Sequence, residues 1–125
     1  MTTVVYVAGF GALGCLTRYY LANWVYAWLG RTFPFGTLVV NLAGAFMIGL
    51  LMELSLRSTL VPPSLRVGLA IGFLGGLTTF STFSYETYRL LEDGQFVTAL
   101  ANILASVAVC LALTWVGILV ARQIT

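Results

Sequence analysis

The residues best suited to chemistry lie together in one ten-residue stretch, Gly75–Ser84, with the sequence GGLTTFSTFS. Adjacent glycines and several hydroxyls weaken an α-helix, because glycine costs backbone entropy and hydroxyls compete for backbone partners. The stretch lies within a long apolar run, so we expect a helix broken near residues 75–79. Freed carbonyls are ligands for a hard cation such as Na⁺, and freed amides and hydroxyls are donors for an anion. An intact helix with hydroxyls bonded to the preceding turn is the alternative.

Phe80 and Phe83 are three residues apart in this stretch, so on a helix both rings lie on one face. The edge of an aromatic ring carries positive quadrupole charge and attracts an anion weakly. A weak attraction suits permeation, because an ion must leave as readily as it enters. Two phenylalanines that only face lipid or the protein core are the alternative.

Other polar groups interrupt the apolar runs. Asn41 has a donor and an acceptor to satisfy near the middle of the second run. In the fourth run, polar or polarisable residues recur at every fourth position and predict a stripe on one helix face, formed by Asn102, Ser106, Cys110 and Thr114. Such a stripe either lines a pathway or forms hydrogen bonds between helices.

Two ionisable residues fall inside the runs, Arg18 near the middle of the first and Glu86 near the end of the third. A charge inside a membrane is costly and marks a functional site by default. If Arg18 faces an aqueous vestibule, it raises the local anion concentration. The alternative is that each residue pairs structurally or extends its charged group to the interface.

The composition of the chain predicts which structural elements hold these residues in place. The chain has 60% apolar and 8% charged residues, against about 25% charged in a soluble domain. We therefore expect a single all-α membrane domain in a lipid bilayer, with a break in its third span. The four expected transmembrane helices cover residues 4–29, 37–56, 64–91 and 96–121.

The same composition excludes other classes. A net charge of +2, with no lysine and no run of arginines, gives no electrostatic footprint for nucleic acid. Histidine is absent and the four carboxylates are scattered, so no acid and base pair at a spacing usable by an enzyme. The sequence predicts neither an enzyme nor a nucleic-acid partner.

The arginines at the ends of the spans are nearly balanced across the membrane. Four spans place Arg57, Arg66 and Arg122 on one side, and Arg31 and Arg89 on the other. Since arginine asymmetry sets orientation, such a chain is able to insert both ways and to pair with an inverted copy. An antiparallel homodimer is therefore a hypothesis, and a single orientation set by weak signals is the alternative.

Glycine recurs every fourth residue at Gly68, Gly72 and Gly76. Small residues at this spacing predict close packing of helices in a membrane. Backbone that lines a pore at Gly75 and Gly76 is the alternative.

The 75–84 stretch resembles the signature of the Fluc family of fluoride ion channels. The likeness covers the whole chain: it includes Gly14 and Arg18 in the first span, and the sequence GTLVVN at residues 36–41. It implies an antiparallel homodimer that exports fluoride passively across a bacterial inner membrane, through two pores flanking a central Na⁺.

The resemblance also implies residue roles. Backbone carbonyls of Gly75 and Thr78 would bind the Na⁺, and Arg18 and Glu86 would lie in the vestibule and near a pore mouth. The fluoride pathway would contain Asn41, Phe80, Phe83, Ser81, Thr82, Ser106 and Thr114. Asn102 and Cys110 depart from the aromatic or hydroxyl-bearing residues typical of the family at these places, so the resemblance assigns them no role.

A small dual-topology multidrug exporter, also of four spans, is the alternative function. Such exporters resemble one another in an essential glutamate within the first helix, whereas this chain has Arg18 there and no carboxylate. A membrane subunit that only scaffolds partners is a third interpretation, and it would leave the 75–84 stretch without a role.

Overall fold

The computed structural model describes residues 1–125 and contains only helices. Four helices are long and apolar enough to cross a membrane, namely Thr2–Leu29, Phe35–Arg57, Pro63–Glu92 and Phe96–Ile124. The prediction of an all-α membrane protein with four spans is confirmed. Six of the eight span ends lie one to three residues beyond the expected limits, and the ends at Leu29 and Phe96 coincide with them.

The third and fourth spans are each built from several helical pieces. Helices α1 (Thr2–Leu29) and α2 (Phe35–Arg57) are continuous. The third span contains α3 (Pro63–Val67), the π-helical segment η1 (Gly68–Leu74), α4 (Gly75–Leu77) and α5 (Phe80–Glu92). The fourth contains α6 (Phe96–Leu104), the π-helical segment η2 (Ala105–Val109) and α7 (Cys110–Ile124). The spans therefore curve rather than form a straight bundle.

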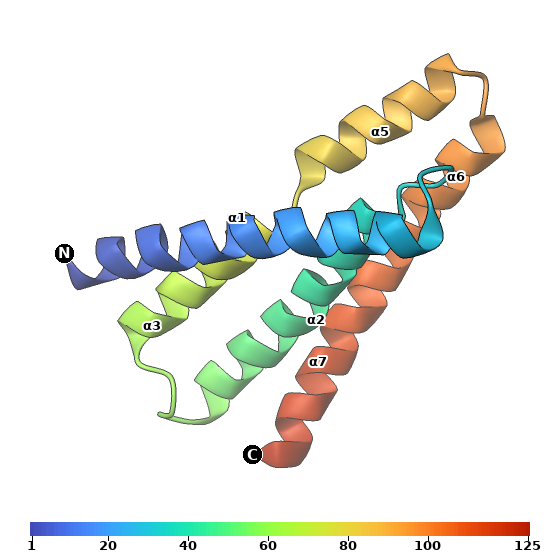
Figure 1. Ribbon diagram of the computed structural model, residues 1–125. Helices are drawn as coiled ribbons and strands as arrows, with labels where there is room; N and C mark the ends of the chain where they lie inside the picture. Colours follow the sequence, from blue (N-terminus) through green and yellow to red (C-terminus); the bar gives the residue numbers. More distant parts are fainter.

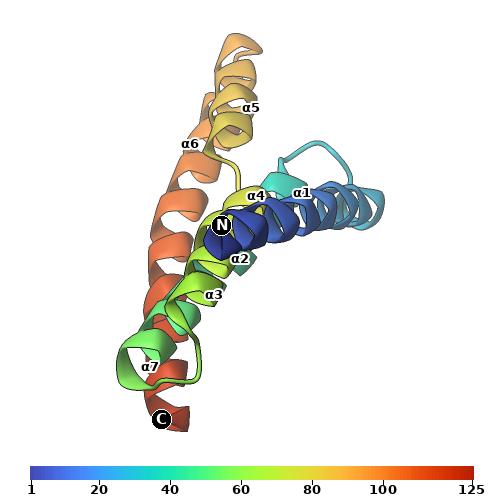
Figure 2. The same ribbon diagram turned by 90° about the vertical axis from the view of Figure 1, so that its left-hand side faces the viewer.

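Two pairs of helices make up the body of the protein (Figure 1). Helices α2 and α7 run side by side, and α1 lies across η1 and α4 (Figures 1 and 2). Helix α5 diverges from the body after the break and pairs with α6. The two chain ends and the α2–α3 connection lie toward one end of the molecule, and the α1–α2 connection and the α5–α6 turn toward the other (Figure 1).

Glycines allow these helices to approach closely. In the α2–α7 pair, Gly49 lies against the carbonyl of Thr114 and Gly117 lies against the carbonyl of Phe46. In the second pair, Gly72 and Gly76 lie against the backbone of α1. Backbones separated by small residues gain van der Waals contact and Cα–H···O interactions, which are the main attractions available in lipid. The glycine repeat therefore serves packing.

Few residues are buried within one copy of the chain. Only 19 of the 125 residues are buried, and three buried apolar side chains, those of Val40, Leu74 and Leu77, pack together as a hydrophobic cluster. These three side chains fill the space between α2 and the third span, next to the break. Most of the other large apolar side chains are exposed or only partly buried, as expected for a protein whose solvent is lipid.

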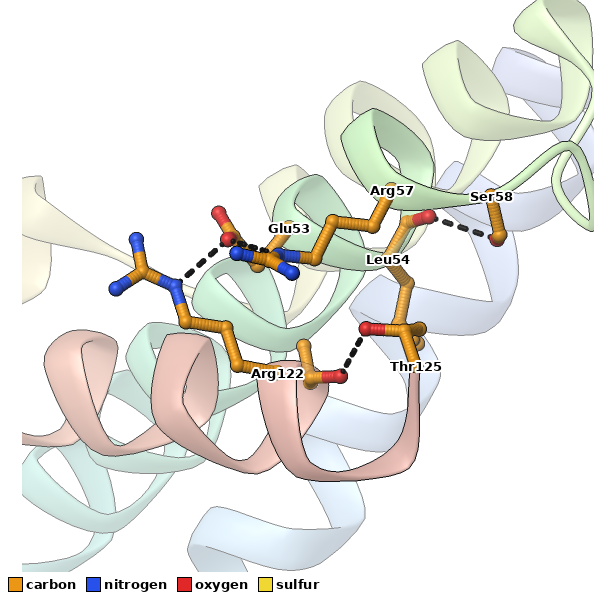
Figure 3. A network of polar contacts seen from close by, with 7 residues as sticks. Glu53, Leu54, Arg57, Ser58, Arg122 and Thr125 are labelled. Atoms are coloured by element: carbon orange, nitrogen blue, oxygen red, sulfur yellow. Dashed lines mark hydrogen bonds and ion pairs between the residues drawn. The ribbon is translucent and has the colours of Figure 1, made fainter.

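An ion-pair cluster joins the ends of α2 and α7 (Figure 3). The Oε1 atom of Glu53 accepts hydrogen bonds from Nε of Arg57 and from Nε of Arg122, both at 2.8 Å. Both arginines are about half exposed, so the cluster contributes little to stability on its own. Its role is geometric, because one carboxylate links two spans at one end of the molecule.

The glycine contacts give a test of the packing. Gly117→Ala adds a Cβ that meets the carbonyl of Phe46, and overpacking of this kind costs roughly 1–3 kcal/mol. We expect the thermal unfolding temperature of the detergent-solubilised protein to fall.

Gly9→Ala is the matched control, because an added Cβ there meets nothing within 4 Å. Alanine stabilises a helix interior by roughly 0.5–1 kcal/mol relative to glycine, so this variant should unfold at the same temperature as the parent or higher. Equal losses in the two variants would contradict the packing interpretation.

Candidate functional site

The third span is interrupted at Thr78 and Thr79, at the end of the stretch where the sequence predicts a break. Both residues have extended backbone, with φ and ψ of −94° and 157° at Thr78 and −152° and 112° at Thr79. The side chain of Asn41 on α2 binds both backbone groups of Thr79. Its Nδ2 donates to the Thr79 carbonyl at 3.0 Å, and its Oδ1 accepts from the Thr79 N–H at 2.7 Å. An asparagine amide thus replaces the partners that a helix would supply.

Four carbonyls, those of residues 75–78, lose their helical donors at this break, and the outer two show how. In a continuous α-helix the Thr79 N–H would donate to the Gly75 carbonyl and the Thr82 N–H to the Thr78 carbonyl. Here the Thr79 N–H donates to Asn41, and the Thr82 N–H donates to the Thr79 hydroxyl at 3.2 Å. The carbonyls of Gly75 and Thr78 are therefore available to another ligand. Of the four carbonyls without helical donors, the resemblance assigns these two to Na⁺.

The start of α5 carries a cluster of hydroxyls. Thr79 is its N-cap residue, and the Thr79 hydroxyl donates to Oγ1 of Thr82 at 2.9 Å. The Ser81 hydroxyl lies 3.2 Å from the same Thr79 oxygen. Caps of this kind satisfy N–H groups that a helix leaves open at its first turn. Ser81 and Thr82 thus both contact the Thr79 hydroxyl at the break. The hydroxyl hydrogen of Thr82 remains free to donate elsewhere.

A hollow of about 260 Å³ opens beside the break and is called here the phenylalanine hollow. Its lining combines groups from α2, the break, α5 and the fourth span: Asn41, Thr78, Thr79, Phe80, Phe83, Ser106, Val107 and Cys110. The ring centroids of Phe80 and Phe83 are 5.4 Å apart. The Ser106 hydroxyl is buried and has no hydrogen-bond partner, which is unusual for a native polar group.

The two phenylalanines of this hollow differ in burial. The Phe83 side chain is buried, whereas Phe80 is 77% exposed. In a single copy, Phe83 thus forms a wall of the hollow and Phe80 forms its open edge.

A second hollow, of about 540 Å³, lies between α1 and α5 and is called here the vestibule. Arg18, Thr82 and Glu86 all line it. The resemblance assigns Arg18 to a vestibule and Glu86 to the neighbourhood of a pore mouth. Oε2 of Glu86 accepts a hydrogen bond from the Tyr26 hydroxyl at 3.0 Å, while Oε1 is buried without a partner. The vestibule and the phenylalanine hollow share Thr79, so the two are adjacent.

Tyr26 was not among the predicted site residues. Its hydroxyl lies 3.4 Å from Oγ1 of Thr37, and the Arg31 guanidinium lies 4.5 Å from the centroid of its ring. The only signal in the sequence was a phenol inside an apolar span, which requires a polar partner. That partner, Glu86, is 60 residues away and could not be identified from spacing.

A third hollow, of about 360 Å³, continues from the phenylalanine hollow toward α7. It shares Asn41, Thr78 and Cys110 with that hollow and is also lined by Gly75 and Thr114. The Thr114 hydroxyl donates to the Ala45 carbonyl at 3.0 Å, so in this structure it ties α7 to α2. The break thus lies in a row of connected hollows.

Asn102 lies apart from the polar stripe expected on the fourth span. It is buried between α5 and α6, where its Nδ2 donates to the Thr87 hydroxyl at 2.9 Å. The stripe is divided because η2 lies within it, and a π-helical turn shifts the following residues relative to the preceding ones.

These features define a small multi-pass membrane protein whose third span is interrupted beside a row of hollows, and comparison with known proteins gives its family. Residues 5–118 match the family described as CrcB-like protein, Camphor Resistance (CrcB). The chain belongs to this family, which confirms the resemblance found in the sequence.

Relatives from several bacteria carry the name fluoride-specific ion channel FluC. The relative from Geobacter metallireducens is 70% identical over 124 residues, which cover 99% of this chain and 100% of the relative. Those from Geotalea uraniireducens and Geotalea daltonii are 67% and 68% identical with the same coverage. An ion channel is not an enzyme, in agreement with the composition, and these bacterial relatives indicate a multi-pass bacterial membrane protein.

The Asn41 bonds give a second test. Asn41→Leu leaves the N–H and carbonyl of Thr79 without partners, at roughly 1–3 kcal/mol for each group. We expect a lower unfolding temperature and faster hydrogen exchange at the Thr79 amide.

Asn23→Leu is the control, since Asn23 is an exposed asparagine on α1 that makes no hydrogen bond. If both variants kept the parent's stability and exchange rate at Thr79, Asn41 would not be the partner that holds the break.

Proposed function

We propose that the chain is a fluoride-selective channel that lets fluoride leave a bacterial cell passively across the inner membrane. The observation that carries this proposal is the buried Ser106 hydroxyl, which has no partner and lies in the phenylalanine hollow beside the break. A buried donor without a partner needs a water molecule or an anion. The name of the relatives, fluoride-specific ion channel, supports fluoride as that anion.

The phenylalanine hollow offers donors that can replace the water molecules around a fluoride ion as it loses its hydration shell. Ser106 provides a hydroxyl hydrogen, and Asn41 has one amide hydrogen left after its bond to Thr79. Phe80 and Phe83 offer ring edges of positive quadrupole charge. Because several weak donors replace the hydration shell, fluoride is bound well enough to enter and weakly enough to leave.

The vestibule supplies anions to this hollow. Arg18 makes no ion pair within the chain, so its charge is available to attract anions. The Glu86 carboxylate would oppose this effect, and its hydrogen bond from Tyr26 offsets part of its charge. Thr79 and Thr82 continue the polar surface from the vestibule to the phenylalanine hollow.

The freed carbonyls of Gly75 and Thr78 fit a central Na⁺. A hard cation takes oxygen ligands, and two carbonyls from each of two copies would give four. Gly75 is exposed in a single copy, so its backbone is accessible to a second chain. When bound, Na⁺ supplies a fixed positive charge that joins the two copies and neutralises oxygen dipoles inside the membrane.

An inverted second copy accounts for the open side of the break. Backbone groups without partners do not persist against lipid, and the hollows are open in a single copy. The balanced arginines permit insertion in both orientations. A two-fold axis through the Gly75 region would cover both breaks at once, and its symmetry would generate two equivalent pores.

Fluoride efflux from liposomes tests the function. We expect the reconstituted protein to release fluoride without a proton gradient, with little chloride flux. Phe80→Ile removes a ring edge from the hollow and should lower the flux while the dimer persists in size-exclusion chromatography.

Phe96→Ile is the matched control, because Phe96 is 66% exposed and lies at the start of α6. Flux no greater than from empty vesicles, or chloride flux equal to fluoride flux, would refute the channel proposal. If Phe80→Ile conducted as well as Phe96→Ile, the Phe80 ring would not belong to the pathway.

Topology requires a separate experiment. A single cysteine appended after Thr125, in a chain whose Cys15 and Cys110 are replaced by serine, should react with a membrane-impermeant maleimide from both sides of the membrane. Roughly equal labelling of intact cells and inverted vesicles is expected, since near-equal arginine counts set no strong orientation. Labelling from one side alone would contradict the antiparallel dimer.

A further inference from the structure

A chain of buried hydrogen bonds runs from α6 to the backbone of Phe83. Nδ2 of Asn102 donates to the Thr87 hydroxyl at 2.9 Å, and the Thr87 hydroxyl donates to the Phe83 carbonyl at 2.7 Å. All three residues are buried, with Asn102 only 2% exposed. These two hydrogen bonds therefore link α6 to Phe83, the residue whose ring forms a wall of the phenylalanine hollow.

The chemistry of the three groups determines which one donates and which one accepts in each of these two hydrogen bonds. The amide nitrogen of Asn102 is only a donor, so the Thr87 oxygen accepts and its own hydrogen is directed to Phe83. A threonine in a helix populates two χ1 rotamers, one of which bonds to the preceding turn. The Asn102 bond selects that rotamer. Bonding of a hydroxyl to the carbonyl four residues earlier also bends a helix, so the shape of α5 near Phe83 depends on a residue of α6.

Helix α5 needs such support because it begins at a break. Its covalent connection to α4 passes through two extended residues, which transmit little helical order. Two asparagines from other helices secure it: Asn41 holds Thr79 at its start, and Asn102 holds Thr87 two turns later. Phe80 and Phe83 lie between these two attachment points.

We propose that Asn102 is a positioning residue for permeation: through Thr87 it fixes the backbone of Phe83, and thereby the ring that walls the pathway, without contacting the ion. This inference rests on the proposed channel function. Asn102 would then position Phe83 rather than line the pathway, as the polar stripe on the fourth span suggests. Thr87 would serve the same positioning role.

Fluoride efflux from liposomes tests the consequence for permeation. Asn102→Leu and Thr87→Val should each lower the flux by roughly tenfold, the rate equivalent of one lost buried hydrogen bond. Because both substitutions break the same series of hydrogen bonds, the flux of the double variant should be no lower than that of either single variant. Thr87→Ser keeps the hydroxyl and should conduct like the parent.

Thr17→Val is the matched control. The Thr17 hydroxyl donates to the Leu13 carbonyl at 2.7 Å, the same bond to the preceding turn, but on the exposed face of α1 with no donor from a second helix. Its loss should leave the flux unchanged.

A second measurement reports the environment of the Phe83 ring and does not depend on fluoride transport. With 4-fluorophenylalanine incorporated at position 83, the ¹⁹F spectrum in fluoride-free buffer should show one sharp resonance in the parent. Asn102→Leu and Thr87→Val should shift, broaden or split it, whereas Thr87→Ser and Thr17→Val should not.

The outcomes separate the inference from the proposed function. No flux in the parent refutes the channel, while the spectra still test the positioning. A conducting parent with unchanged flux or unchanged spectra in Asn102→Leu overturns the inference, as does an additive loss in the double variant. If Asn102→Leu does not fold, the comparison of Thr87→Val with Thr87→Ser decides, and equal flux in those two variants overturns the inference.

Discussion

The structure depends on how one peptide unit inside the membrane finds its hydrogen-bond partners. Thr79 leaves the helical ladder inside a membrane span, where lipid offers no hydrogen bonds and an unsatisfied backbone group costs several kcal/mol. The Asn41 side chain supplies both partners. Once Thr79 is satisfied from outside its own helix, the carbonyls of Gly75 and Thr78 are released and α5 can leave the body of the protein. The break, the hollows and the available oxygens all follow from this exchange.

Close packing is what allows a side chain as short as asparagine to reach the break. The core side chains Val40, Leu74 and Leu77 lie beside Asn41 and the break. Gly44, one turn after Asn41, faces the Thr78 side chain, and any larger residue there would push the break away. Lipid provides no hydrophobic force to press helices together, so contact through small residues has to do so. The glycines and the polar site are thus parts of one arrangement.

The sequence identified the spans and the weak point of the third, but not the hydrogen-bond partners. Spans follow from composition because the bilayer requires about twenty apolar residues for each crossing. Asn41 was expected to need a partner, yet its choice of Thr79 depends on how α2 packs. Thr114 and Asn102 share a four-residue period but bond to α2 and α5 respectively, because the π-helical segment between them shifts the register. The Tyr26–Glu86 bond joins residues too distant in sequence for any pattern to connect.

The bonds between Asn41 and Thr79 also have a consequence for biogenesis. A chain is synthesised from its N-terminus, so α2 enters the bilayer before the third span emerges. The partner that the interrupted helix requires is therefore already in place when Thr79 arrives. Insertion in the reverse order would leave a bare peptide unit in hydrocarbon. The position of Asn41 upstream of the break thus gives the nascent chain a template for its own irregular segment.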